Sequence, residues 1–123
     1  MIVIESVNYI GITVADLDRS VEFYKEFFDF EIVDNISTAG QAFLKMGDIM
    51  LALEEIEGYE AGADTGVCVS FFVDEEDFDD VIDDIKEEGI EIVSGPENLR
   101  KGQRVVILDP DGNRIELSYP RID

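Results

Sequence analysis

Glu116 is the side chain best placed to do chemistry, because it stands between Ile115 and Leu117 in a short apolar run. In an apolar cleft, desolvation would raise the pKa of this carboxyl group, which could then hold a ligand cation or act as a base. The alternative is a carboxylate at the rim of a cleft, paired with Arg114 two residues away on the same strand face. We take Glu116 as the first candidate for ligand binding.

Three further side chains could contact a ligand, although none has an obvious activating partner. Histidine, the commonest general base and metal ligand at neutral pH, is absent. Cys68 therefore has no imidazole to activate it, and a role as a small buried side chain is its alternative. Tyr9 and Phe72 could stack on a planar ligand, or they could be structural aromatic residues.

A basic cluster stands in and after a loop that we expect from Gly95-Pro96 to Gly102. Its members are Arg100, Lys101 and Arg104. One interpretation is a lid that clamps a carboxylate of a ligand, which makes Arg104 a ligand-binding residue. The other is that these charges only offset the acids around them.

The charge of the chain limits its partners. It has 30 Asp and Glu residues against 9 Lys and Arg, a net charge of −21. Such a surface repels phosphate backbones and anionic lipids, so we expect neither nucleic acid nor membrane partners. The acidic run from Asp74 to Glu91 is interpreted as a solvated helix face, and a docking surface for a basic partner is the alternative.

Length and cysteine content indicate one ordinary domain. The 123 residues are 46% apolar, enough for one core but too few for two independent ones. The one cysteine cannot close an intrachain disulfide. The start, Met1 to Glu5, lacks the basic region of a signal peptide, and no apolar run is long enough to span a bilayer. We expect a cytoplasmic protein.

An internal repeat organises the chain. Phe30-Glu31-Ile32-Val33 and Ile90-Glu91-Ile92-Val93 stand sixty positions apart, each after an amphipathic pattern typical of a helix. Each half predicts a strand, a helix and three more strands. The expected strands are 9–14, 30–37, 41–46 and 49–54, then 68–73, 90–94, 103–108 and 114–119; Asp16 is expected to cap the first helix, and the second is expected over 77–88. We expect a single domain over 1–123, with module one about 1–56, a linker about 57–65 and module two about 66–123.

Strand alternation separates a core face from a ligand face. Ile10, Ile12 and Val14 share one side of their strand, whereas Tyr9, Gly11 and Thr13 share the other. Neither half can bury both faces of its own sheet, so the halves must pair. The predicted fold class is α+β, with two βαβββ modules forming a curved mixed sheet around a cleft.

Two segments resemble the vicinal oxygen chelate superfamily, the glyoxalase/bleomycin-resistance/extradiol-dioxygenase group. The opening of that family is similar to Tyr9-Ile-Gly-Ile-Thr-Val-Ala-Asp-Leu-Asp-Arg-Ser-Val-Glu-Phe-Tyr24. Its closing hairpin is similar to Asp109-Pro-Asp-Gly-Asn-Arg-Ile-Glu-Leu117. The resemblance implies the glyoxalase/bleomycin-resistance fold for the whole chain.

The resemblance also implies where a metal would bind. Members with metal chemistry take ligands from the first and last strand of each half, and the matching positions here are Tyr9, Ala52, Cys68 and Glu116. Only Glu116 keeps a usual ligand, so the metal-free branch of the bleomycin-resistance type is expected. The resemblance therefore implies a homodimer without a cofactor. This homodimer would sequester a small molecule, such as an antibiotic, in its cleft. Its ligand-binding residues would be Tyr9, Cys68, Phe72, Arg104 and Glu116.

Two alternatives stay open. One is a lyase, isomerase or dioxygenase of the same superfamily that depends on a divalent metal ion, with Glu116 as its ligand. The other is an acidic protein-interaction module that uses the helix at 77–88. The sequence favours binding over catalysis.

Overall fold

The computed structural model describes residues 1–60 and 67–122. The chain divides into two compact units, Met1–Ala61 and Gly62–Asp123. Of the linker expected at 57–65, residues 61–65 lie outside the described residues. That the two units act as one domain over 1–123 stays a prediction. Within the described residues, no helix has both the length and the apolar character that crossing a membrane requires.

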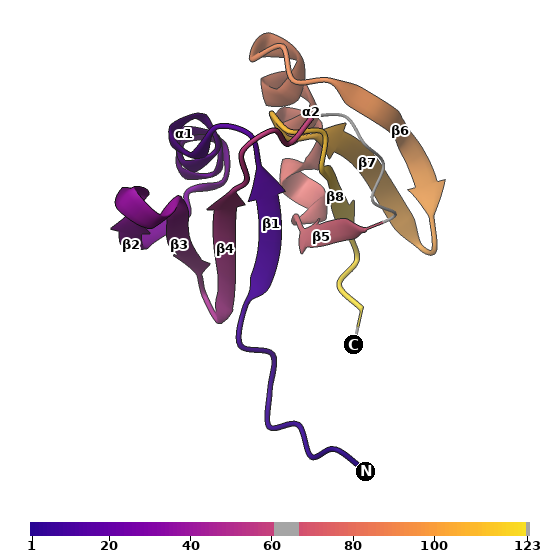
Figure 1. Cartoon of the computed structure of the whole chain (residues 1–123). Coiled ribbons are helices and arrows are strands. Elements are labelled where there is room, and N and C mark those ends of the chain that lie inside the picture. Colours follow the sequence, from indigo (N-terminus) through magenta and orange to yellow (C-terminus); the bar gives the residue numbers. More distant parts are fainter. Residues whose placement is uncertain (61–66, 123) are drawn as a thin grey trace. The chain divides into compact units, whose positions relative to one another are not determined.

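The first unit is a four-stranded sheet with one α-helix (Figure 1). Its elements are β1 (Ile10–Val14), α1 (Leu17–Phe28), β2 (Glu31–Ile36), the short 3-10 helix η1 (Ser37–Ala39), β3 (Gln41–Met46) and β4 (Ile49–Glu55). The strand order is β1-β4-β3-β2. β1 is parallel to β4, and the other neighbours are antiparallel.

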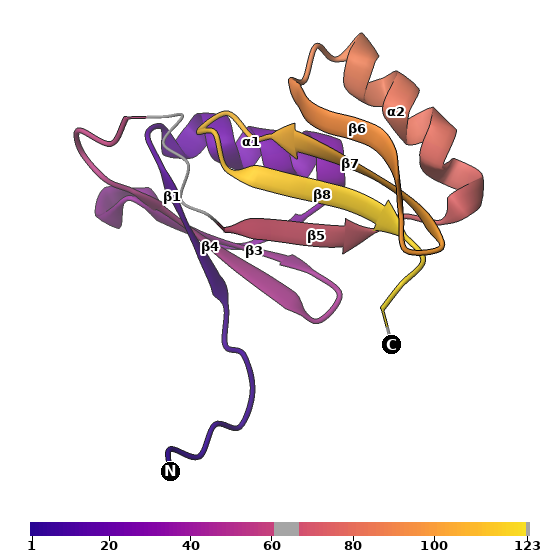
Figure 2. The same cartoon turned by 90° about the vertical axis from the view of Figure 1, so that its right-hand side faces the viewer.

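The second unit repeats this arrangement, and Figure 2 shows its strands and α2. Its elements are β5 (Cys68–Phe72), η2 (Glu75–Asp77), α2 (Phe78–Glu87), β6 (Ile92–Leu99), β7 (Gly102–Leu108) and β8 (Arg114–Tyr119). The order β5-β8-β7-β6 matches that of the first unit, with β5 parallel to β8. The α+β fold class with two βαβββ modules is confirmed.

Both ends of α1 follow from the local sequence. Asp16 is extended, and its Oδ1 accepts the backbone N–H of Arg19 at 3.1 Å, which is the expected N-cap. The N–H of Leu17 donates to Oε2 of Glu55 on β4 at 2.7 Å, so the sheet also satisfies the start of the helix. The helix ends at Asp29, whose φ of 56° is left-handed.

Each helix presents an apolar stripe to its sheet and a polar face to solvent. In α2 the buried residues are Phe78, Ile82 and Ile85, and the ring of Phe78 packs edge-on against Tyr119 of β8. The acidic side chains of this helix are exposed: Asp79, Asp80, Asp83, Asp84 and Glu87. In the sheets, Leu51, Leu53, Ile115 and Leu117 are buried. These burials match the core face expected from alternation.

The sequence predicts a loop from Gly95-Pro96 to Gly102. This prediction is wrong, because β6 continues to Leu99. The pairing of β6 with β7 shifts register between Ser94 and Glu97, which marks a bulge. Gly95 has a φ of +87°, and a Cβ there would lie 2.6 Å from the Arg104 carbonyl oxygen. A bulge accommodates glycine and proline within a strand pair, so the hairpin extends beyond them.

Gly102 lets β7 approach β8 closely, and this contact gives a stability test. A Cβ at Gly102 would overlap the Tyr119 carbonyl oxygen, whereas a Cβ at Gly11 would meet its nearest atom at 3.8 Å. We expect Gly102→Ala to lower the free energy of unfolding by about 1–3 kcal/mol through overpacking. Gly11→Ala, also on a strand, serves as the control and should change it little. Urea denaturation measures both, and equal effects would contradict the close packing of β7 on β8.

Candidate functional site

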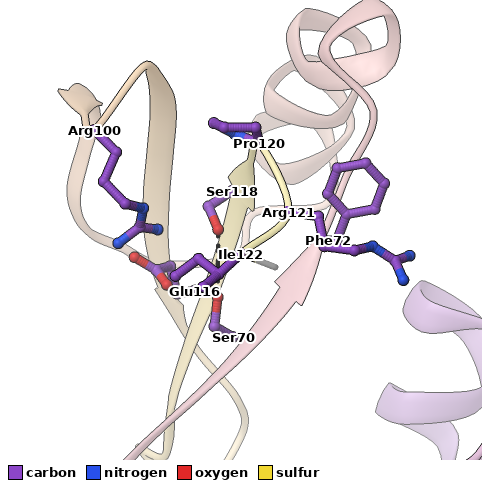
Figure 3. Close-up of a pocket in the computed structure, with 8 residues that line it drawn as sticks. All are labelled: Ser70, Phe72, Arg100, Glu116, Ser118, Pro120, Arg121 and Ile122. Carbon is purple, nitrogen blue, oxygen red and sulfur yellow. Dashed lines mark hydrogen bonds between the residues drawn. The ribbon is translucent and has the colours of Figure 1, made fainter.

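A pocket of about 280 Å³ opens at the end of β5 and β8 in the second unit (Figure 3). Its lining combines a carboxylate, two hydroxyls, an aromatic ring and two guanidinium groups. The lining residues are Ser70, Phe72, Arg100, Glu116, Ser118, Pro120, Arg121 and Ile122. The parallel register places Ser70 beside Glu116 and Phe72 beside Ser118, which puts these side chains on one face.

Glu116 is the acid of this pocket. Its side chain is only 12% exposed, and its Oε1 accepts a hydrogen bond from Nη1 of Arg104 at 3.4 Å. The cation that pairs with it thus comes from the neighbouring strand β7. The sequence suggests a different ion pair, between Glu116 and Arg114 on β8 itself. Oε2 of Glu116 makes no hydrogen bond to the described residues, so one oxygen is available to a ligand.

Arg104 joins two carboxylates. Its Nε donates to Oε1 of Glu97 at 2.7 Å, and its Nη1 donates to Glu116. The hydrogen bond to Glu97 is the largest cause of the raised pKa of Arg104, and the one to Glu116 adds to it. The bulge at Gly95 makes this possible, because it brings Glu97 opposite Arg104 in the strand pairing. Arg104 therefore positions Glu116 and remains charged.

The rest of the pocket offers hydroxyls and cations. The Oγ atoms of Ser70 and Ser118 lie 3.3 Å apart. The guanidinium of Arg121 lies 4.9 Å from the centre of the Phe72 ring, a cation–π contact. Arg100 occupies the turn after β6 with a left-handed φ of 56°, and its side chain extends toward Glu116 in Figure 3. Arg100 forms no ion pair with the described residues.

Cys68 lies on the same sheet face, next to Glu116. It is exposed, and its Sγ is 3.8 Å from the carbonyl oxygen of Val69. Desolvation and the Glu116 carboxylate raise the pKa of this thiol. A hydrogen bond with the Glu116 backbone, Arg114 and Arg104 act in the opposite direction and are outweighed. The thiol therefore stays protonated at neutral pH.

The structure thus brings four of the five candidate residues together in the second unit. Phe72 and Glu116 line the pocket, Arg104 holds Glu116, and Cys68 lies beside it. Tyr9 lies in the first unit, in a separate pocket of that unit. The sequence reasoning missed Arg121, for which the only signal was a basic residue shortly after the last strand of an acidic chain.

The described residues include no group of three or more Cys, Asp or Glu side chains that could hold a metal ion. The second unit supplies two donors, the Glu116 carboxylate and the Cys68 thiol. Both are ordinary metal ligands, and a thiol donates once it is deprotonated. These two donors thus suit two of the coordination positions of a divalent ion.

The chain resembles known proteins over most of its length. The model of the glyoxalase/bleomycin resistance protein/dioxygenase superfamily matches residues 6–117. The metallothiol transferase FosB of Staphylococcus epidermidis is 32% identical over 117 residues, 93% of this chain and 81% of that protein. The fosfomycin resistance protein FosX of Mesorhizobium loti has a TM-score of 0.78 at 23% identity, over 98% of this chain and 96% of its own. FosX of Listeria monocytogenes, complexed with manganese(II) and sulfate, has a TM-score of 0.82 at 19% identity. This match covers 98% of this chain and 94% of the FosX chain.

These comparisons correct one expectation and confirm another. The expectation that no cofactor is used is wrong, since one relative is named a metallothiol transferase and a FosX neighbour was solved with manganese(II). The same findings favour the metal-dependent enzyme, which the sequence left as an alternative, over metal-independent sequestration. The resemblance of the opening and closing segments is confirmed. With the family model matched over residues 6–117, the chain belongs to the glyoxalase/bleomycin resistance protein/dioxygenase superfamily.

Proposed function

We propose that this protein is an enzyme that acts, with a divalent metal ion, on a small molecule bearing an anionic group, in the pocket of the second unit. The observation that carries the proposal is Glu116, a largely buried carboxylate held at one oxygen by Arg104. A carboxylate kept in place by an arginine and left with a second oxygen suits ligand or metal binding. The relatives support the metal and the small molecule, since their names refer to a metallothiol transferase and to fosfomycin resistance.

The distribution of charge supports an anionic group on the substrate. Five of the nine Lys and Arg residues lie between Arg100 and Arg121. Arg100 and Arg121 line the pocket, where Glu116 is the one acid among the lining residues. The chain has a net charge of −21, so a pocket with two arginines and two hydroxyls is a local exception to its acidic character. Guanidinium groups bind carboxylates and phosphates through directed hydrogen bonds.

Each side chain then has a distinct task. Arg104 fixes Glu116, while Ser70 and Ser118 offer hydroxyls to the polar part of the substrate. Phe72 supplies an apolar wall. Glu116 and Cys68 would hold the divalent ion, which when bound supplies a Lewis acid for a substrate oxygen. The remaining positions of the ion would be open to water, substrate or a further side chain. The homodimer expected from the resemblance stays part of this proposal.

The metal ligand is tested with Mn²⁺ on the full chain. We expect Glu116→Gln to weaken Mn²⁺ binding by at least about tenfold, because it removes an anionic donor. Glu97→Gln is the matched control. Glu97 is the other carboxylate that Arg104 contacts, and the substitution removes the same charge. Isothermal titration in about 0.15 M salt, which limits non-specific binding, measures both. Equal affinities in the two variants would contradict a role for Glu116.

Turnover is measured with the same proteins. Fosfomycin is the first substrate to try, with and without an added thiol, and mass spectrometry follows its consumption. We expect consumption to need Mn²⁺ and Glu116. Binding of Mn²⁺ at Glu116 without conversion of fosfomycin would reject this substrate while keeping the metal site.

The anion site is tested with sulfate as the probe. Arg100→Gln should weaken sulfate binding by about tenfold, the effect of losing one charge-assisted hydrogen bond. Lys101→Gln changes the same charge one residue away, outside the pocket lining, and should leave binding nearly unchanged. NMR titration of both variants gives the affinities. An equal loss in both would indicate attraction by charge alone.

The reactivity of Cys68 checks the electrostatics around Glu116. Because the Glu116 carboxylate raises the pKa of the thiol, its removal lowers that pKa and increases the thiolate fraction. Glu116→Gln should therefore be alkylated by iodoacetamide faster than the unchanged protein at pH 8, and Glu97→Gln should not. Mass spectrometry of timed samples gives the rates, and a slower reaction in Glu116→Gln would contradict the assigned direction.

A further inference from the structure

The segment after β8 carries an arginine to the pocket of the second unit. β8 ends at Tyr119, and Arg121 follows two residues later. This arginine lines the pocket together with Phe72, the last residue of β5. The parallel register pairs Phe72 with Ser118 of β8, so its ring lies close to the point where the segment leaves the sheet.

The ring of Phe72 is the contact that holds Arg121. Cζ of the guanidinium group lies over the ring, 4.9 Å from its centre, which is within the roughly 6 Å of a cation–π contact. Arg121 makes no ion pair or side-chain hydrogen bond with the described residues. Among these residues, the aromatic ring thus takes the place that a carboxylate would usually take beside an arginine.

This contact leaves the hydrogen-bond donors of Arg121 available. Arg104 differs in this respect, because it donates to the carboxylates of Glu97 and Glu116. An aromatic ring attracts a cation through its face, whereas the N–H groups of a guanidinium lie in the plane of that group. Arg121 is therefore held in place with its donors free, and a donor that is oriented in advance binds an anion at a lower entropic cost.

The contact also separates the charges of the pocket. In Figure 3, Arg100 and Arg121 lie on opposite sides, with Glu116 and Ser70 between them. Opposite charges a short distance apart attract each other, so without the ring Arg121 would be drawn toward Glu116. The ring keeps the cation apart from this carboxylate. Each of the two groups then remains available to a ligand of its own.

We infer that Phe72 is a positioning residue, whose ring holds Arg121 in the orientation that binds the anionic group of the substrate. The inference rests on the proposed function, since it requires an anionic substrate in this pocket. It gives Phe72 a task beyond that of an apolar wall. The ring acts on the substrate through Arg121.

The probe is sulfate, titrated into the full ¹⁵N-labelled chain in about 0.15 M sodium chloride and followed by NMR. Phe72→Leu keeps an apolar side chain and removes the ring. We expect it to weaken sulfate binding by about threefold, the effect of losing one cation–π contact at an exposed site. Phe72→Tyr retains the ring and should bind sulfate like the unchanged protein.

Phe27→Leu is the matched control. It makes the same substitution at a ring of similar exposure, 39% against 44% for Phe72, and this ring belongs to the first unit. Sulfate affinity should stay unchanged in this variant. Circular dichroism confirms that each variant is folded.

A double-variant cycle separates positioning from a wall. Arg121→Gln should weaken sulfate binding by about tenfold. In that background, Phe72→Leu should have no further effect, because the ring has no cation left to hold. The NMR spectrum gives a second signature. The ring current of Phe72 shifts the side-chain protons of Arg121 upfield, and Phe72→Leu should remove this shift while Phe72→Tyr keeps it.

Four results would overturn the inference while the metal test at Glu116 and the sulfate test at Arg100 keep their meaning. They are unchanged sulfate affinity in Phe72→Leu, tighter binding in that variant, an equal loss in Phe27→Leu, and additive losses in the double variant. The last would show that the ring acts on the anion independently of Arg121. If sulfate does not bind to the unchanged protein, the proposed anion site and this role of Phe72 are both wrong.

Discussion

Parallel pairing of the first and last strand in each unit determines which side chains share a face. In the second unit it sets Ser70 beside Glu116, and in the first it sets Gly11 beside Ala52. Because side chains alternate along a strand, the residues between them point to the helix and form the core. A shift of one residue in the pairing of β8 with β5 would send Glu116 into the core and Leu117 to the pocket. The chemistry of the protein thus depends on register more than on any one contact.

Arg104 shows how a strongly acidic chain keeps a carboxylate in a fixed place. The guanidinium group contacts Glu97 and Glu116 together, so the two acids share one cation. The contact to Glu116 is longer and less exposed than the contact to Glu97. Since exposed ion pairs contribute little to stability, the value of this bridge lies in orientation. The remaining arginines near the pocket act over short distances, because salt screens charges beyond about 8 Å.

Much of the architecture could be predicted from the sequence. The repeat, the helix that starts after Asp16 and most of the strands follow from local patterns of apolar residues, caps and turns. The path of β6 could not, because Gly95-Pro96 is typical of a loop and only the pairing with β7 makes a bulge there. The partner of Glu116 could not either. Arg114 is nearer in sequence, but Arg104 reaches the carboxylate across the strand pair. The expectation of a protein without a cofactor rests on the absence of histidine, the commonest metal ligand, and the relatives named for metal-dependent chemistry contradict it.

The alternation that separates core from pocket also has an evolutionary consequence. In each duplicated half, substitutions on the pocket side leave the packing beneath the helix untouched. Two halves with the same topology can therefore differ in polarity on the pocket side, with Glu54 in one and Arg104 in the other, at little cost in folding. Selection for a new ligand would then act on about half the positions of each strand, which leaves the scaffold free to be reused.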